Sequence, residues 1–72
     1  MKREPIQSVI IGSAGYAPDS ELLELEFVPT GAVYAYFHVP ESIFRAFMGA
    51  RSKGAFFNKR IRDHFQFQKL TE

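Results

Sequence analysis

Two segments of the chain alternate between apolar and polar residues, which is the pattern of a β-strand with one buried face. In residues 23–27, Glu24 and Glu26 separate three large apolar side chains. In residues 33–39, Tyr34, Tyr36 and His38 separate four apolar side chains. We therefore expect two strands whose apolar rows face the core, with both tyrosines on the opposite face.

The short link between these segments predicts a β-hairpin. Matching the apolar rows pairs Phe27 with Val33 and Leu25 with Ala35, and leaves residues 29–31 as a three-residue loop. The third residue of such a loop takes a left-handed backbone conformation, which suits Gly31. In this register the two tyrosines project beside the two glutamates of the first strand.

Helical patterns follow the hairpin. Pro40 suits the entry to a helix, and residues 41–50 place four large apolar side chains on one stripe: Ile43, Phe44, Phe47 and Met48. Ser52 is a good N-cap for a second helix. Its core stripe would have the spacing i, i+4, i+8, with the residues Phe57, Ile61 and Phe65.

A further strand precedes the hairpin, because residues 8–16 are rich in β-branched residues and residues 17–20 have Pro and Asp in turn positions. Strands that come first and helices that follow are typical of an α+β domain. We predict a three-stranded antiparallel meander followed by two helices packed on its apolar face, in one domain over residues 1–72.

Composition narrows the setting of this domain. The 72 residues include no cysteine, so neither a disulfide framework nor a thiolate metal cluster holds the chain together. The start, MKREPIQS, has no signal-type apolar stretch, and no apolar run approaches the ~18 residues of a membrane span. We expect a cytoplasmic, soluble, monomeric protein with no membrane partner.

The charge is unevenly distributed. Residues 1–41 hold two cations and six anions, whereas residues 42–72 hold seven cations and two anions. Such an asymmetry indicates a polyanionic partner for the basic part. Attraction between two oppositely charged layers of one fold explains it equally well.

The segment SKGAFFNKRIRDHF, residues 52–65, is the first candidate site. On a helical wheel Lys59 and Arg62 lie opposite the Phe57 stripe, with Asn58 beside them, and Arg60 lies on the other flank near Phe56. An aromatic ring beside cations is what single-strand binders use for bases and phosphates. The alternative is that Phe56 packs on the first helix and the cations are simply solvated.

Two further candidates are weaker. Ser52 and Lys53 lie at the positive end of the second helix and could hold one phosphate oxygen, although capping alone explains Ser52. Tyr34 and Tyr36, two residues apart on one strand, could form a stacking platform, although cross-strand packing explains them as well. His38 and His64 are on different elements, so we expect no catalytic site, metal or cofactor.

With these residues identified, the chain resembles the KTSC domain family, which is named after the C-terminal part of some lysyl-tRNA synthetases and also occurs as a free-standing bacterial protein. The sequence YAY, Tyr34 to Tyr36, is similar to the central Y-x-Y motif of the family, and SKGAFFN is similar to its S-x-G-x-[YF]-F-N segment. Several positions depart from the family pattern by losing polar groups: Val9, Ile10, Ala17, Phe56, Phe65 and Phe67.

The family has no established activity to carry over, but RNA binding has been suggested for it. We therefore expect a non-catalytic binding module for RNA or other single-stranded nucleic acid. The residues expected to carry this binding are Tyr34, Tyr36, Lys53, Phe56, Asn58, Lys59, Arg60 and Arg62. The alternative is a module that binds a protein partner or a second copy of itself.

Overall fold

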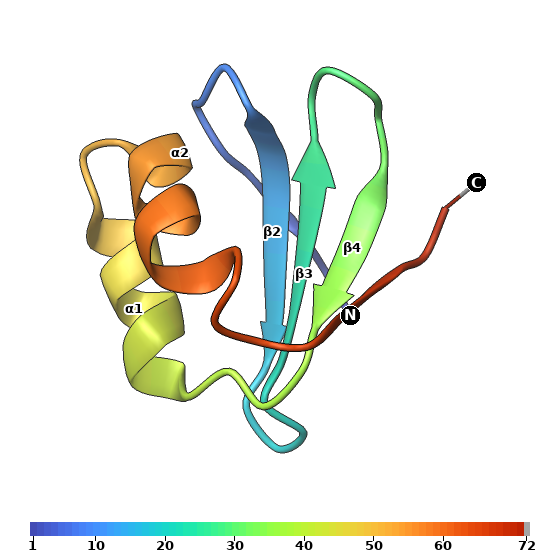
Figure 1. Ribbon diagram of the computed structural model, residues 1–72, viewed down its shortest axis with the longest axis vertical. Helices are drawn as coiled ribbons and strands as arrows, with labels where there is room; N and C mark the ends of the chain where they lie inside the picture. Colours follow the sequence, from blue (N-terminus) through green and yellow to red (C-terminus); the bar gives the residue numbers. More distant parts are fainter. Residues whose placement is uncertain (72) are drawn as a thin grey trace.

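The computed structural model describes residues 1–71 and shows one antiparallel sheet with the strand order β1-β2-β3-β4-β5. Helices cover one face of this sheet, and the C-terminal segment returns alongside β4 (Figure 1). The strands are β1 (Glu4–Pro5), β2 (Ile11–Ala17), β3 (Leu22–Phe27), β4 (Val33–Tyr36) and β5 (Phe67–Lys69). The helical elements are α1 (Glu41–Gly49), α2 (Lys53–Phe56) and the π-helical segment η1 (Phe57–Ile61).

The predicted α+β class is confirmed, but the sheet has five strands and not three. The two additional strands, β1 and β5, have two and three residues, and all their side chains are exposed. Neither strand therefore has the buried face that identifies a half-buried strand. The core lies between the sheet and the helices, and its fully buried side chains include Ile11, Leu23, Leu25, Phe47 and Ile61.

The predicted hairpin register is wrong by one residue. Glu26, and not Phe27, pairs with Val33, and Leu25 pairs with Tyr34. The Phe27 amide donates to the Ala32 carbonyl at 2.8 Å, so the loop has four residues, 28–31. Gly31 does adopt the predicted left-handed conformation, with φ of 72°.

The additional loop residue reverses the two faces of β4, because side chains alternate along a strand. Tyr34 and Tyr36 lie on the helix-covered face with Leu25 and Leu23, their cross-strand partners. The smaller Val33 and Ala35 turn to the other face. The apolar surface of two aromatic rings exceeds that of Val and Ala, and this favours the observed register over the predicted one.

The opposite face of the sheet carries a polar network. Arg3 forms an ion pair with Glu24 at 3.0 Å, and its Nε donates to Ser13 Oγ at 3.0 Å. The Ser13 hydroxyl in turn donates to Glu26 at 2.8 Å. The glutamates predicted to lie beside the tyrosines therefore lie on the other side of the sheet.

The first helix has the predicted bounds within a residue, and Glu41 pairs with Arg45 at 3.1 Å. Ser52 caps α2 as predicted, because its Oγ accepts from the Ala55 amide at 3.1 Å. The second helix departs from the prediction, since it changes to a π turn and ends before Phe65. Within the described residues, no helix has the length and apolar character needed to cross a membrane.

Candidate nucleic-acid interface

A groove of about 500 Å³ lies between the segment 57–63 and the strands β3, β4 and β5. We call it the aromatic groove. Rings line its floor, and polar side chains from the helical segment form one wall. The residues on which its chemistry depends are Phe27, Tyr34, Phe57, Asn58, Arg62 and Phe67.

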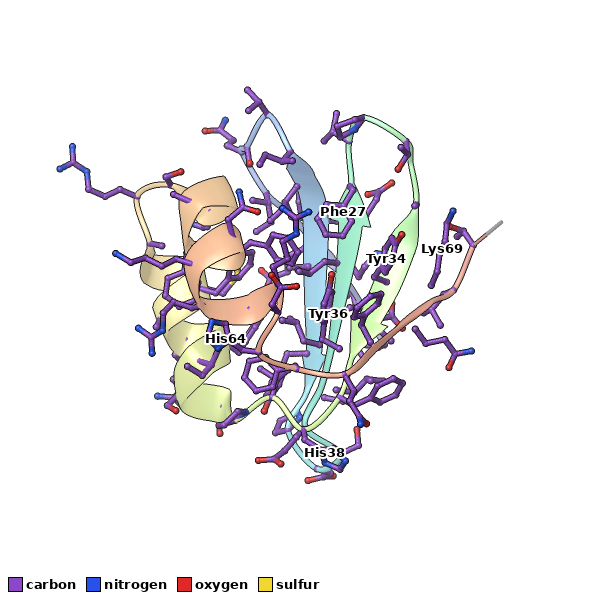
Figure 2. The ribbon with its side chains drawn as sticks, in the orientation of Figure 1. Phe27, Tyr34, Tyr36, His38, His64 and Lys69 are labelled. Atoms are coloured by element: carbon purple, nitrogen blue, oxygen red, sulfur yellow. The ribbon has the colours of Figure 1, made fainter. Side chains whose placement is uncertain are left out.

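The floor is a cluster of five rings in mutual contact. Phe57 lies 5.1 Å from Phe27 and 5.7 Å from Tyr36, both in edge-to-face geometry. Phe67 lies 5.7 Å from each tyrosine, measured between ring centroids. Figure 2 shows Phe27, Tyr34 and Tyr36 together on the strands beside the helical layer. These spacings are those of favourable aromatic pairs, so the floor is packed rather than loose.

The rings differ in their access to solvent. Tyr36 is only 4% exposed, whereas Phe67 is 56% exposed and Tyr34 is intermediate. Burial, with a smaller contribution from Tyr34, raises the pKa of Tyr36 to about 12, and the nearby Arg62 guanidinium acts in the opposite direction. Tyr36 therefore belongs to the core. The prediction that both tyrosines form an outer platform is wrong for Tyr36, and Tyr34 retains partial access.

Three polar side chains on the helical wall face this floor. The Arg62 guanidinium donates to the Asn58 amide oxygen at 3.4 Å, and Asp63 also lines the groove. On the strand side, Lys69 is the cross-strand partner of Tyr34 and lies beside it (Figure 2). The groove thus combines exposed aromatic surface with the charged groups of its helical wall.

The remaining predicted site residues lie outside the aromatic groove. Arg60 lies over the Phe56 ring, 5.7 Å from its centroid, and Lys59 is exposed beside them. Phe56 also packs against Phe47 at 6.1 Å, which agrees with the simpler interpretation of its role. The Lys53 ammonium donates to the Ala50 carbonyl at 2.5 Å and so binds the end of α1.

Four of the eight predicted residues therefore line the aromatic groove, and four lie outside it. Those in the aromatic groove are Tyr34, Tyr36, Asn58 and Arg62, and those outside it are Lys53, Phe56, Lys59 and Arg60.

Sequence reasoning missed Phe67, which lines the groove, and Lys69, the cross-strand partner of Tyr34. Phe67 and Lys69 are on β5, which the sequence pattern left as a tail of uncertain form. The signal was the alternation of Phe65, Phe67 and Lys69 with glutamines, a run too short to separate a strand from a loop.

The histidines lie apart in the structure (Figure 2). His38 lies two residues after the end of β4 in a left-handed conformation with φ of 59°, and the His64 ring lies 3.0 Å from the Lys59 carbonyl. Among residues 1–71, no three His, Asp or Glu side chains gather closely enough to hold a metal ion.

Comparison with known proteins places this chain in a family. The profile of the KTSC domain matches residues 7–65. The chain belongs to the KTSC domain family. A crystal structure of a KTSC domain protein from Yersinia pestis superposes with a TM-score of 0.93 at 41% identity, and the match covers 97% of both chains.

Curated relatives of this KTSC domain are of two kinds. An uncharacterised protein of Stutzerimonas stutzeri is 37% identical, and the match covers 97% of this chain and 99% of that protein. A lysine–tRNA ligase of Nostoc punctiforme is 39% identical over 62 residues, which are 86% of this chain and 11% of the ligase. The same domain therefore occurs both as nearly a whole protein and as a small part of a large enzyme.

Proposed function

We propose that this KTSC domain is a non-catalytic module that binds single-stranded nucleic acid, and RNA in particular, in the aromatic groove. The observation that carries this proposal is the convergence of Tyr34, Asn58, Arg62 and the exposed Phe67 on one groove. Stacking of a base on an aromatic ring contributes about 1 to 3 kcal/mol. Phe67 offers the largest open ring surface for it.

Cations near the groove supply the second requirement of a single-strand binder. Arg62 lines the groove, and Lys59 and Arg60 lie exposed on the same short segment. The charges of Lys59 and Arg60 would hold the phosphates of a strand whose base lies in the groove beside Arg62. Asn58 carries no charge and can bind either a base edge or a phosphate.

The relatives add support of a different kind. The segments of lysine–tRNA ligases that match this chain belong to enzymes that act on tRNA. An RNA-binding role for such an added segment is consistent with that setting, and we extend it to the chain described here.

The proposal is tested by fluorescence anisotropy with labelled single-stranded RNA and DNA at several salt concentrations. Affinity of the wild type should fall with salt by about 0.7 log units per log unit for each phosphate contact. The triple variant Lys59→Glu, Arg60→Glu, Arg62→Glu should retain the fold, because exposed charges contribute little to stability. It should lose most of its affinity.

A matched control is the triple variant Lys2→Glu, Arg45→Glu, Arg51→Glu, which changes the net charge equally but leaves the groove intact. Its affinity for the labelled strands should stay close to that of the wild type, with only the small decrease that the changed net charge causes. Equal loss in both triple variants, or no binding by the wild type at low ionic strength, would contradict the proposal.

One observation favours a second candidate function. Phe67 and Leu70, 56% and 48% exposed, give an apolar character to the free edge of the sheet at β5. Exposed strand edges pair readily with other chains. If the wild type binds no nucleic acid but forms a dimer whose stability is insensitive to salt, this edge is the interface to examine.

A further inference from the structure

The aromatic groove has one cation and one carboxylate in its lining, and they are neighbours in the chain. Arg62 and Asp63 both line it, together with the Asn58 amide and the Thr30 hydroxyl. All other lining side chains are aliphatic or aromatic. A groove that needed only phosphate contacts would not gain from a carboxylate, so the pair requires another explanation.

Arg62 supplies donors only. A guanidinium carries five N–H groups in a rigid fork and accepts no hydrogen bond. One Nη1 group is directed to the Asn58 amide oxygen at 3.4 Å, which restrains the side chain against the helical wall. The remaining N–H groups are available to a ligand that presents two adjacent acceptors.

Asp63 has the opposite property, since a carboxylate accepts and does not donate. It is exposed and takes part in no ion pair among the described residues. Its charge disfavours a phosphate at this point of the groove. A ligand group with two adjacent donors suits it.

Resting on the proposed function, we propose that the base held in the aromatic groove is guanine within a single strand. The Arg62 fork donates to O6 and N7 of the base, and the Asp63 carboxylate accepts from N1–H and the N2 amino group. The ring of the base stacks on Phe67 and the accessible part of Tyr34.

The other bases do not match this pair. Adenine presents a donor, its N6 amino group, beside N7, so the Arg62 fork would face one donor and one acceptor. Cytosine and uracil lack two adjacent N–H donors on different atoms for Asp63. Stacking itself does not discriminate, because every base has an aromatic face.

The first experiment varies the ligand and keeps the wild-type protein. Dissociation constants are measured by anisotropy for the RNA pentamers UUGUU, UUAUU, UUCUU and UUUUU. Guanine should bind more tightly than each other base by about 5- to 150-fold, the range of a bidentate contact. Replacing guanine by inosine removes the N2 donor, and replacing it by 7-deazaguanine removes the N7 acceptor. Each analogue should lose part of the preference.

The second experiment varies the protein. Asp63→Asn should reduce the preference for guanine, and its matched control Asp19→Asn, in a turn remote from the groove lining, should not. Arg62→Lys keeps the charge but loses the fork, so it should reduce the guanine preference more than the affinity for UUUUU. Its control is Arg45→Lys on the exposed side of α1.

The outcomes separate this inference from the proposed function. Equal affinity for the four pentamers, or an unchanged guanine preference in Asp63→Asn, overturns the guanine assignment and leaves single-strand binding standing. If guanosine monophosphate binds as tightly as UUGUU, the guanine assignment stands. The claim that the ligand is a single strand is then contradicted, because the rest of the strand adds no affinity. A guanine preference in both UUGUU and the DNA pentamer TTGTT supports direct reading of the base.

Discussion

The aromatic cluster should separate stability from binding, and Phe57 and Phe67 provide the test. Both are phenylalanines in contact with Tyr36, at the same centroid distance of 5.7 Å. They differ in exposure, since Phe57 is 7% exposed and Phe67 is 56% exposed. Replacing each by alanine therefore changes the same chemical group in two different environments.

The expected losses follow from burial. Truncating a buried phenylalanine costs about 3 to 5 kcal/mol, through lost transfer free energy and the cavity that remains. A domain of this length has a total stability of about 4 to 11 kcal/mol. Phe57→Ala should therefore remove about a quarter or more of this stability. For Phe67, less than half of the side chain is buried and water fills the space, so the loss should be about 1 to 2 kcal/mol.

The assay is thermal unfolding followed by circular dichroism. Each kcal/mol lowers the Tm of a domain this small by about 4 to 8 °C. Phe57→Ala should lower the Tm by at least about 12 °C, and Phe67→Ala by much less. At a temperature where both are folded, Phe67→Ala should show the larger loss of RNA affinity. If Phe57→Ala melts like the wild type, or if Phe67→Ala is equally destabilising, the assigned core is wrong.

Three further predictions concern single positions. Tyr36→Phe should reduce the fall in stability between pH 10 and pH 12 by about 2 to 3 kcal/mol, because the pKa of Tyr36 is raised to about 12 and the tyrosine of the unfolded chain ionises first. The raised pKa of Tyr16 leaves part of the fall in place, and urea unfolding at each pH measures the difference between the two proteins. Ser52→Ala should cost about 1 kcal/mol through the lost cap, and a threonine at this position should restore most of it in the same assay. Gly54→Ala should destabilise the domain by about 1 kcal/mol, because the new Cβ would lie 2.6 Å from Ile10 Cδ1 and the cost of this overpacking exceeds the gain in helix propensity. An unchanged Tm would show that the Ile10 side chain moves aside freely.

The sequence pattern predicted the parts of the fold that depend on local signals. The Ser52 cap and the left-handed Gly31 were both predicted from residue type and spacing, and both are observed. Each requires only a few neighbouring residues. The predicted burial of Phe57 and Ile61 is also confirmed, because helical spacing defines a face without reference to the rest of the chain.

The hairpin register could not be predicted in the same way. The alternation in residues 33–39 is between apolar residues and tyrosines, and a tyrosine is apolar over most of its surface. Both faces of β4 could therefore face a core. The choice between them depends on Phe57 and Phe67, which lie more than 20 residues later in the chain and pack on Tyr36. The predicted register came from matching the apolar rows of the two strands, so it took no account of these contacts.

The candidate site was predicted only in part, and the reason is again a contact between distant parts of the chain. Asn58 and Arg62 were selected as a helical face, and Tyr34 as a strand face, but nothing in the local sequence shows that these faces meet. The π turn at residues 57–61 rotates the end of the helix relative to an α-helical wheel, so a wheel at 100° per residue loses accuracy there. Phe67 was missed because β5 is exposed along its whole length.

The division of the aromatic cluster into a buried and an exposed part has a consequence for how the site can work. Tyr36 and Phe57 are buried and hold the floor of the aromatic groove in place. A ligand therefore binds to rings that are already ordered, and binding loses little side-chain entropy. The groups that would contact the ligand, Phe67, Arg62 and Asp63, are exposed and contribute little to the core. Substitutions at these three positions can therefore alter affinity and base preference without unfolding the domain, whereas the same experiment on Tyr36 would confound binding with stability.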